Sequence, residues 1–145
     1  MKIGILGGTF APAHNGHVSM AKRAVDQLLL DKLIVMPNGL PPHKENVLDK
    51  NDRFQIASLA FADIPKVEVS DYELKKEGAD YSYITLEYFK SRFPHDQLYF
   101  IMGGDSFRDF PLWRNPQRIA ELAILAVAER KDTFTEQTVD FIKKR

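Results

Sequence analysis

Residues 2–17 of the chain read KIGILGGTFAPAHNGH, and this stretch is the strongest indication of the fold class. Residues 2–6 form a short apolar run with β-branched side chains, which is typical of a buried parallel strand. Gly7 and Gly8 allow a sharp turn, and residues 15–30 repeat apolar side chains at helical spacing. The stretch therefore predicts a strand, a glycine loop and an amphipathic helix.

Strands and helices alternate along the rest of the chain. A second apolar run at 33–36 completes a right-handed βαβ unit. Beyond it the patterns predict strands at 67–69, 98–102 and 123–128, helices at 52–62, 81–92, 114–121 and 135–144, a loop at 40–49 and an exposed excursion at 70–80. This order predicts one domain, 1–145, of the α/β class with a Rossmann-like, doubly wound, mostly parallel five-stranded sheet.

The composition excludes several classes of function. The chain has 145 residues, 44% of them hydrophobic and 28% charged, which suits one soluble globular domain. Lys plus Arg balances Asp plus Glu, 20 against 20, so bulk charge favours neither a nucleic-acid nor a membrane partner. The absence of Cys excludes disulfides, thiolate metal sites and a Cys nucleophile. The apolar run near the N-terminus is too short for a signal peptide, so a cytoplasmic location is expected.

Three polar clusters follow predicted strand ends, at residues 7–17, 37–44 and 103–109. In open α/β sheets the ligand binds beyond the carboxyl ends of the strands. We therefore expect the three clusters to meet at one edge of the sheet.

The first cluster has the chemistry of a phosphate site. It runs into a helix N-terminus, whose free N–H groups and dipole attract phosphate. His14 and His17 are three residues apart and share a helix face, while Gly16 between them leaves that face open. Imidazoles so placed can donate hydrogen bonds and offset charge that develops in a transition state. Taken singly, the histidines also fit surface positions or half of a zinc site, although catalytic zinc usually has three protein ligands.

The motifs together resemble a known family. Residues 7–17 are similar to the H-x-G-H loop of the nucleotidyltransferase superfamily. The segments at 36–38, 41–44 and 81–85, together with Met-Gly-Gly-Asp-Ser at 102–106 and Phe-Pro-Leu-Trp at 110–113, resemble corresponding segments of nicotinate mononucleotide adenylyltransferases. The likeness runs in order through essentially the whole chain.

The resemblance implies adenylyl transfer from ATP to nicotinate mononucleotide, giving deamido-NAD and pyrophosphate, in NAD biosynthesis. Mg²⁺ would accompany ATP, held by phosphates and water and not by a protein metal site. The resemblance further implies a set of site residues: His14, His17 and Lys44 as catalytic phosphate contacts; Gly7, Gly8, Thr9, Phe10, Gly16, Gly103, Asp105 and Arg130 on the ATP side; and Asn38, Thr85 and Trp113 on the mononucleotide side.

Several of these residues also have ordinary structural explanations. Lys44 fits a solvated surface lysine, and Asp105 fits the N-cap of a following helix. Trp113 fits a core aromatic, Thr85 a helix threonine, and Arg130 a solvated strand end. For these positions both explanations stay open.

The sequence departs from the family pattern at two places. Ala11 stands where the family loop carries Asp, and no I-S-S-T-x-x-R element follows, since no Ser occurs after Ser106. We expect either a C-terminally incomplete chain or a nucleotide-binding domain with little catalysis. An incomplete sheet would leave an edge that can pair with a second copy in a homo-oligomer. Adenylyl transfer to nicotinamide mononucleotide is the alternative reaction.

Overall fold

The computed structural model describes residues 1–8, 10, 15–37, 50–75, 82–103, 110–112, 114–129 and 133–137. Within these ranges the fold is built on a six-stranded sheet with the order β3-β2-β1-β4-β5-β6. The strands are β1 (Lys2–Gly8), β2 (Lys32–Pro37), β3 (Val67–Val69), β4 (Gln97–Gly103), β5 (Ile124–Glu129) and β6 (Thr133–Gln137). The first five are parallel, and β6 runs antiparallel to β5.

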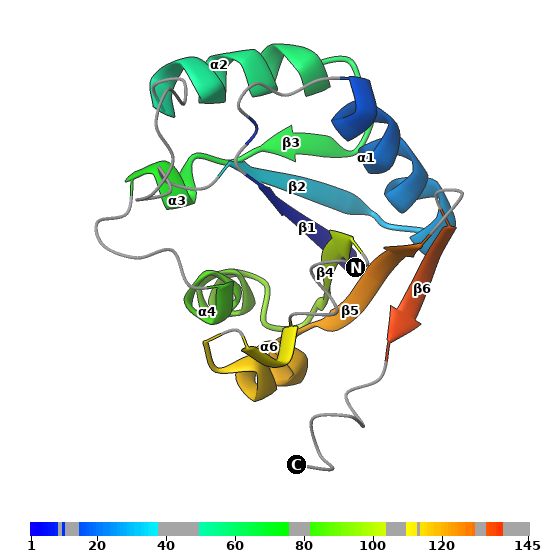
Figure 1. The fold of residues 1–145 in the computed structure, drawn as a ribbon, viewed down its shortest axis with the longest axis vertical. Coiled ribbons are helices and arrows are strands. Elements are labelled where there is room, and N and C mark those ends of the chain that lie inside the picture. The colour runs from blue at the N-terminus through cyan, green and yellow to red at the C-terminus, as the bar shows by residue number, and fades with distance from the viewer. Residues whose placement is uncertain are drawn as a thin grey trace.

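Helices cover both faces of the sheet (Figure 1). On one face α1 (Asn15–Leu28) and α2 (Lys50–Phe61) pack against apolar side chains of β1, β2 and β4. On the other, α4 (Ser82–Arg92), the short 3-10 helix η1 (Phe110–Leu112) and α6 (Pro116–Leu122) pack against alternate side chains of the same strands and β5. Such burial on both faces requires apolar residues at successive strand positions, as in the run Leu33 to Met36.

The predicted α/β class with a parallel five-stranded core is confirmed. The predicted helix at 135–144 is wrong over its first residues, because 135–137 belong to β6. Thr and Phe favour strands, and the backbone groups of β6 form hydrogen bonds with β5. A search for helical spacing of apolar residues cannot detect such a pairing. Residues 138–145 lie outside the described part.

The predicted exposed excursion at 70–80 also needs correction. Residues Tyr72–Lys75 form the one-turn helix α3, in which Glu73 and Leu74 are buried. The helix follows β3 directly and packs back against β2. The charged residues of this segment led to the prediction of an exposed excursion, but its first helical turn belongs to the core. Residues 76–81 lie outside the described part.

The end of α1 differs from its predicted position by two residues. The helix stops at Leu28 because Leu29 adopts a left-handed backbone conformation with φ of 56°, a common way for a helix to terminate. Leu29 is consequently exposed, whereas Leu30 returns to the core. In the part of the chain that the structure describes, we find no helix with the length and apolar character needed to cross a membrane.

Candidate functional site

The parallel strands end together at one edge of the sheet. Gly8 of β1 is paired with Pro37 of β2. Leu6 lies opposite Ile101 of β4, so two residues further on Gly8 and Gly103 close their strands at the same level. Because β1 has β2 on one side and β4 on the other, the strand order reverses here, and such a reversal is the usual ligand crevice of this fold class. We call this place the carboxyl edge.

Phe10, which follows β1, has an unusual backbone conformation. Gly7 and Gly8 remain within the strand, and a Cβ on Gly7 would meet only the Met36 carbonyl oxygen, at 3.9 Å. Phe10 has φ of 49°, a left-handed conformation that costs a non-glycine residue about 1–3 kcal/mol. Gly7 and Gly8 therefore belong to the strand, Gly7 leaves open space beside the backbone, and the left-handed conformation lies at Phe10.

Phe10 connects the loop to a predicted site residue. Its ring is buried, packs edge-on to Phe61 of α2 at 6.3 Å between centroids, and lies 4.7 Å from the His17 imidazole at an interplanar angle of 70°. The strained backbone directs this ring inward, where burial of an aromatic side chain offsets the strain. His17 is half-buried in the first turn of α1, directly after Gly16.

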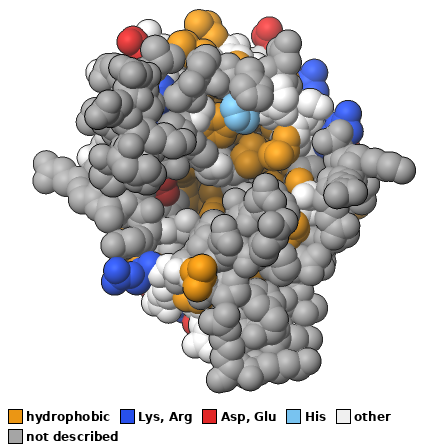
Figure 2. Space-filling model, viewed as in Figure 1, with side chains coloured by type: hydrophobic (Ala, Val, Ile, Leu, Met, Phe, Trp, Pro, Cys, Tyr) orange, Lys and Arg blue, Asp and Glu red, His pale blue; other side chains and the backbone are white. Residues whose placement is uncertain are grey.

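The first turn of α1 adds backbone N–H groups beside the end of β1. The helix begins at Asn15 and carries no acidic residue in its first turn, so its positive dipole end is not neutralised by its own side chains. Backbone N–H groups at a helix N-terminus, together with an imidazole, can bind an anion such as phosphate. Figure 2 shows a histidine beside clustered hydrophobic side chains on the face in view, with Lys and Arg side chains toward the margins.

Three buried polar side chains lie in helices that start from the carboxyl edge. Arg53 is fully buried in the first turn of α2, Glu73 is buried in α3, and Thr85 is buried in the first turn of α4. The Thr85 hydroxyl donates a hydrogen bond of 2.5 Å to a Glu73 carboxylate oxygen. Of these residues the sequence had indicated only Thr85. Buried charged side chains are uncommon, but their burial cannot be known before the fold.

The structure thus describes part of the predicted site. Gly7, Gly8, Phe10, Gly16, His17 and Gly103 gather at the ends of β1 and β4 and the start of α1, and Thr85 lies at the same edge on the opposite face of the sheet. Outside the described residues lie Thr9, His14, Asn38, Lys44, Asp105, Trp113 and Arg130. Within the described part, no group of three or more His, Asp or Glu side chains could hold a metal ion.

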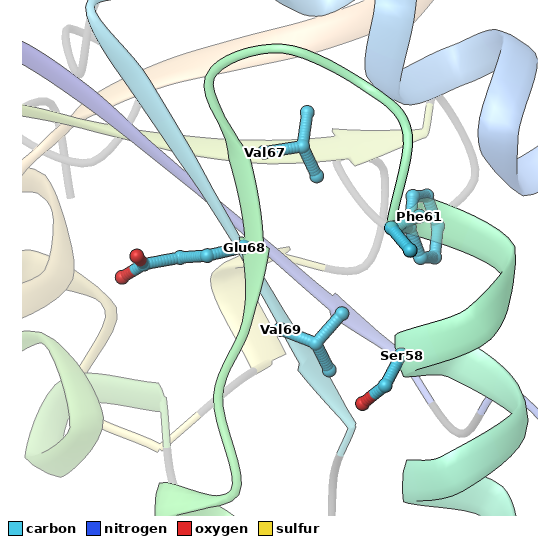
Figure 3. A pocket seen from close by; sticks show the side chains of 6 residues that line it. Ser58, Phe61, Val67, Glu68 and Val69 are labelled. Carbon is cyan, nitrogen blue, oxygen red and sulfur yellow. The ribbon is translucent and has the colours of Figure 1, made fainter.

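A separate pocket of about 110 Å³ lies at the sheet margin, between α2 and β3. Figure 3 shows Val67 and Val69 pointing toward Phe61 and Ser58 of α2, while Glu68 points away. The Ser58 hydroxyl donates to the Phe54 carbonyl, and Glu68 forms an ion pair with Lys32. None of the predicted site residues lines this pocket. It is a surface hollow and lacks the polar groups of the carboxyl edge.

Comparisons with known proteins agree with this geometry. The cytidylyltransferase-like family matches residues 5–144. A Clostridium tetani protein named "probable nicotinate-nucleotide adenylyltransferase" is 44% identical over 99% of this chain and 72% of its own. A Dictyoglomus thermophilum protein of the same name is 41% identical over 99% of this chain and 74% of its own.

A solved structure shares the fold. The Plasmodium falciparum nicotinic acid mononucleotide adenylyltransferase, in complex with NaAD, matches with a TM-score of 0.78 at 18% identity, covering 99% of this chain and 70% of its own. The match extends across both faces of the sheet, so it includes the elements that form the carboxyl edge. The chain belongs to the nicotinate-nucleotide adenylyltransferase family of nucleotidyltransferases.

Proposed function

We propose that the chain transfers the adenylyl group of ATP to nicotinate mononucleotide, giving deamido-NAD and pyrophosphate in NAD biosynthesis, with the cytoplasm as its expected location. The observation that carries the proposal is the placement of His17 in the first turn of α1, beside the end of β1 and held against the Phe10 ring. Membership of the family supports the same reaction.

The reaction needs positioning more than covalent chemistry. A phosphate oxygen of the mononucleotide attacks the α-phosphorus of ATP, and the bond from that phosphorus to the bridging oxygen of the β-phosphate breaks, releasing pyrophosphate. The enzyme lowers the barrier by aligning the two substrates and by stabilising charge on the phosphate oxygens. The N–H groups at the start of α1 and the His17 imidazole are suitably placed donors.

Each side of the carboxyl edge takes one substrate in this proposal. The ATP side comprises the end of β1, Phe10 and the first turn of α1, together with Thr9, His14, Lys44, Gly103, Asp105 and Arg130. Thr85 at the start of α4 lies on the side of the pyridine mononucleotide, together with Asn38 and Trp113. The proposal extends to the residues outside the described part through the family likeness.

Nucleotidyltransferases generally use a divalent metal ion with ATP, and we propose Mg²⁺. The groups described at the carboxyl edge include backbone N–H groups, an imidazole, a hydroxyl and the Glu73 carboxylate, and among the described residues no three His, Asp or Glu side chains gather to hold a metal ion. Such groups fit a Mg²⁺ ion that enters as part of the ATP substrate, with most of its ligands from phosphate and water.

Pyrophosphate release tests the proposal. The protein is incubated with ATP, Mg²⁺ and nicotinate mononucleotide, beside a parallel reaction with nicotinamide mononucleotide. Release that requires the nicotinate form is the expected result. ATP binding without release for either acceptor, from protein shown to be folded, would contradict the proposed reaction and support a nucleotide-binding role.

A further inference from the structure

The hollow between α2 and β3 can take up a side chain from outside the molecule. Val67, Val69 and Phe61 give it apolar walls (Figure 3). On the helix side it is also lined by Ser58 and Ala62, and its volume is about 110 Å³. An apolar cavity of about 150 Å³ holds a benzene molecule, so a hollow of this size accommodates an aliphatic side chain.

An exposed leucine stands beside this hollow on the same helix. Leu59 is 78% exposed and lies on the side of α2 opposite to the buried Ala57 and Phe61. Leu59 and Ala62 are three positions apart, so they are neighbours on the helix surface, and Ala62 lines the hollow. An aliphatic side chain gains free energy when it leaves water. The helix therefore presents an apolar projection and an apolar hollow within one turn of each other.

The strand β3 brings a free sheet edge to the same margin. It is the last strand of the sheet on this side and lies next to α2 (Figure 1). The Lys66 carbonyl and the Ser70 N–H are bonded to β2. By alternation, the backbone groups of Val67 and Val69 face outward, where another chain can approach. Since the strand has only three residues, side-chain contacts have to supply most of the energy of any association.

The charges at this margin favour contact between two copies of the chain. Asp63 and Lys66 are exposed in the connection from α2 to β3. Glu68 is 54% exposed and forms an ion pair with Lys32. Because both signs are present, two copies that face each other can bring unlike charges together, whereas a margin of one sign would repel its own copy.

We propose that α2 and β3 form the contact of a homodimer, in which Leu59 of each copy enters the hollow of the other. Projection and hollow belong to one patch, so a two-fold axis satisfies both copies at once. Such a contact closes at two copies, whereas a head-to-tail contact would continue into a filament. The patch is small beside a standard interface of about 1,600 Å², so we expect a dissociation constant on the order of 10 µM.

Sedimentation equilibrium of the full chain tests the proposal. Over concentrations from about 1 to 300 µM the unaltered protein should pass from monomer to dimer. Leu59→Lys should weaken the dimer roughly a hundredfold, because each dimer would bury two ammonium groups in apolar hollows. The melting temperature of the monomer should be nearly unchanged, since Leu59 is exposed there. A protein that stays monomeric over the whole range would overturn the proposal.

Leu29→Lys is the matched control. Leu29 is 71% exposed at the end of α1, but it does not line the hollow. The same substitution there should leave the dissociation constant within about twofold of the wild-type value, because a residue outside a contact contributes little to it. Equal weakening by Leu29→Lys and Leu59→Lys would mean that exposed leucines associate without a specific site, and it would overturn the proposal.

A mixture of two variants tests the two-fold geometry. Leu59→Ala removes the projection and keeps the hollow, whereas Ala62→Leu fills the hollow and keeps the projection. Each variant alone should dimerise weakly, because it retains neither of the two contacts. An equal mixture should form a heterodimer several-fold more tightly, because one contact remains between unlike copies. A mixture that associates no more tightly than either variant alone would overturn the proposal.

Discussion

The two faces of the sheet contribute to the carboxyl edge by different means. On the α1 face, the end of β1, Phe10 and His17 form a continuous stretch of chain whose chemistry comes from backbone N–H groups and one imidazole. On the α4 face, Glu73 and Thr85 come from separate helices and meet in the core. The comparison shows that local chain structure can place the groups of the α1 face, whereas the Glu73–Thr85 pair depends on contacts set by the tertiary fold.

Substitution of His17 should have the largest effect, because the proposed function assigns the stabilisation of charge to the α1 face. His17→Ala should lower kcat by about 10²–10³-fold, the usual loss for one donor to a transition-state charge. Because His17 is only half-buried, the melting temperature should change little. His95→Ala is the control, since His95 is exposed in the turn before β4, at the opposite edge. Near-normal turnover in His17→Ala would refute its phosphate-stabilising role.

Phe10→Leu should show whether the loop positions His17 or merely fills the core. Leucine retains apolar volume but not the flat ring 4.7 Å from the imidazole, so kcat should fall about tenfold at nearly unchanged KM for ATP. Phe61→Leu alters the same core cluster at the ring that packs on Phe10, and both variants should lose a similar amount of unfolding free energy in urea, about 1–3 kcal/mol. Equal turnover in the two variants would assign Phe10 to packing alone.

The sequence predicted the α1 face better than the α4 face, for a physical reason. The patterns that predicted the α1 face are local: a strand, a pair of glycines and the spacing of two histidines. The strand β1, the helix α1 and the parallel core lie where these patterns predicted them. The strain at Phe10 was not foreseen, since left-handed backbone is usually assigned to glycine. The roles of all the site residues remain predictions. Four of these residues also lie outside the described part of the chain: His14, Lys44, Asp105 and Trp113.

The α4 face depends on a pairing that local patterns do not encode. Thr85 could be named from family likeness, but Glu73 stands in a charged segment that reads as solvent-exposed. Only the packing of α3 against β2 and α4 turns that carboxylate inward. The strand β6 is a second example, because residues 135–137 pair with β5 although the sequence pattern predicted a helix there.

Two glycines of β1, Gly4 and Gly7, differ in the space available for a side chain. A Cβ on Gly4 would lie 2.6 Å from Leu30 Cδ1 and 2.9 Å from Leu33 Cδ1, so Gly4→Ala should reduce the unfolding free energy by about 1–3 kcal/mol. A Cβ on Gly7 has room, so Gly7→Ala should fold normally. It should raise the KM for ATP several-fold, because the proposed function brings phosphate close to the backbone there. Urea unfolding and ATP titration measure the two effects. An unchanged KM in Gly7→Ala would remove Gly7 from the ATP side.

The exposed ion pair between Glu87 and Arg118 should have the smallest effect. It joins α4 to α6 at 3.3 Å, with both side chains more than two-fifths exposed, so Arg118→Ala should change the unfolding free energy by less than about 1 kcal/mol. Any difference should vanish in 1 M salt, because screening at that ionic strength is effective beyond roughly 3 Å. A larger loss that persists in salt would mean that α6 helps to hold α4, and with it Thr85, in position. The position of Thr85 would then depend on a wider set of tertiary contacts than its hydrogen bond with Glu73.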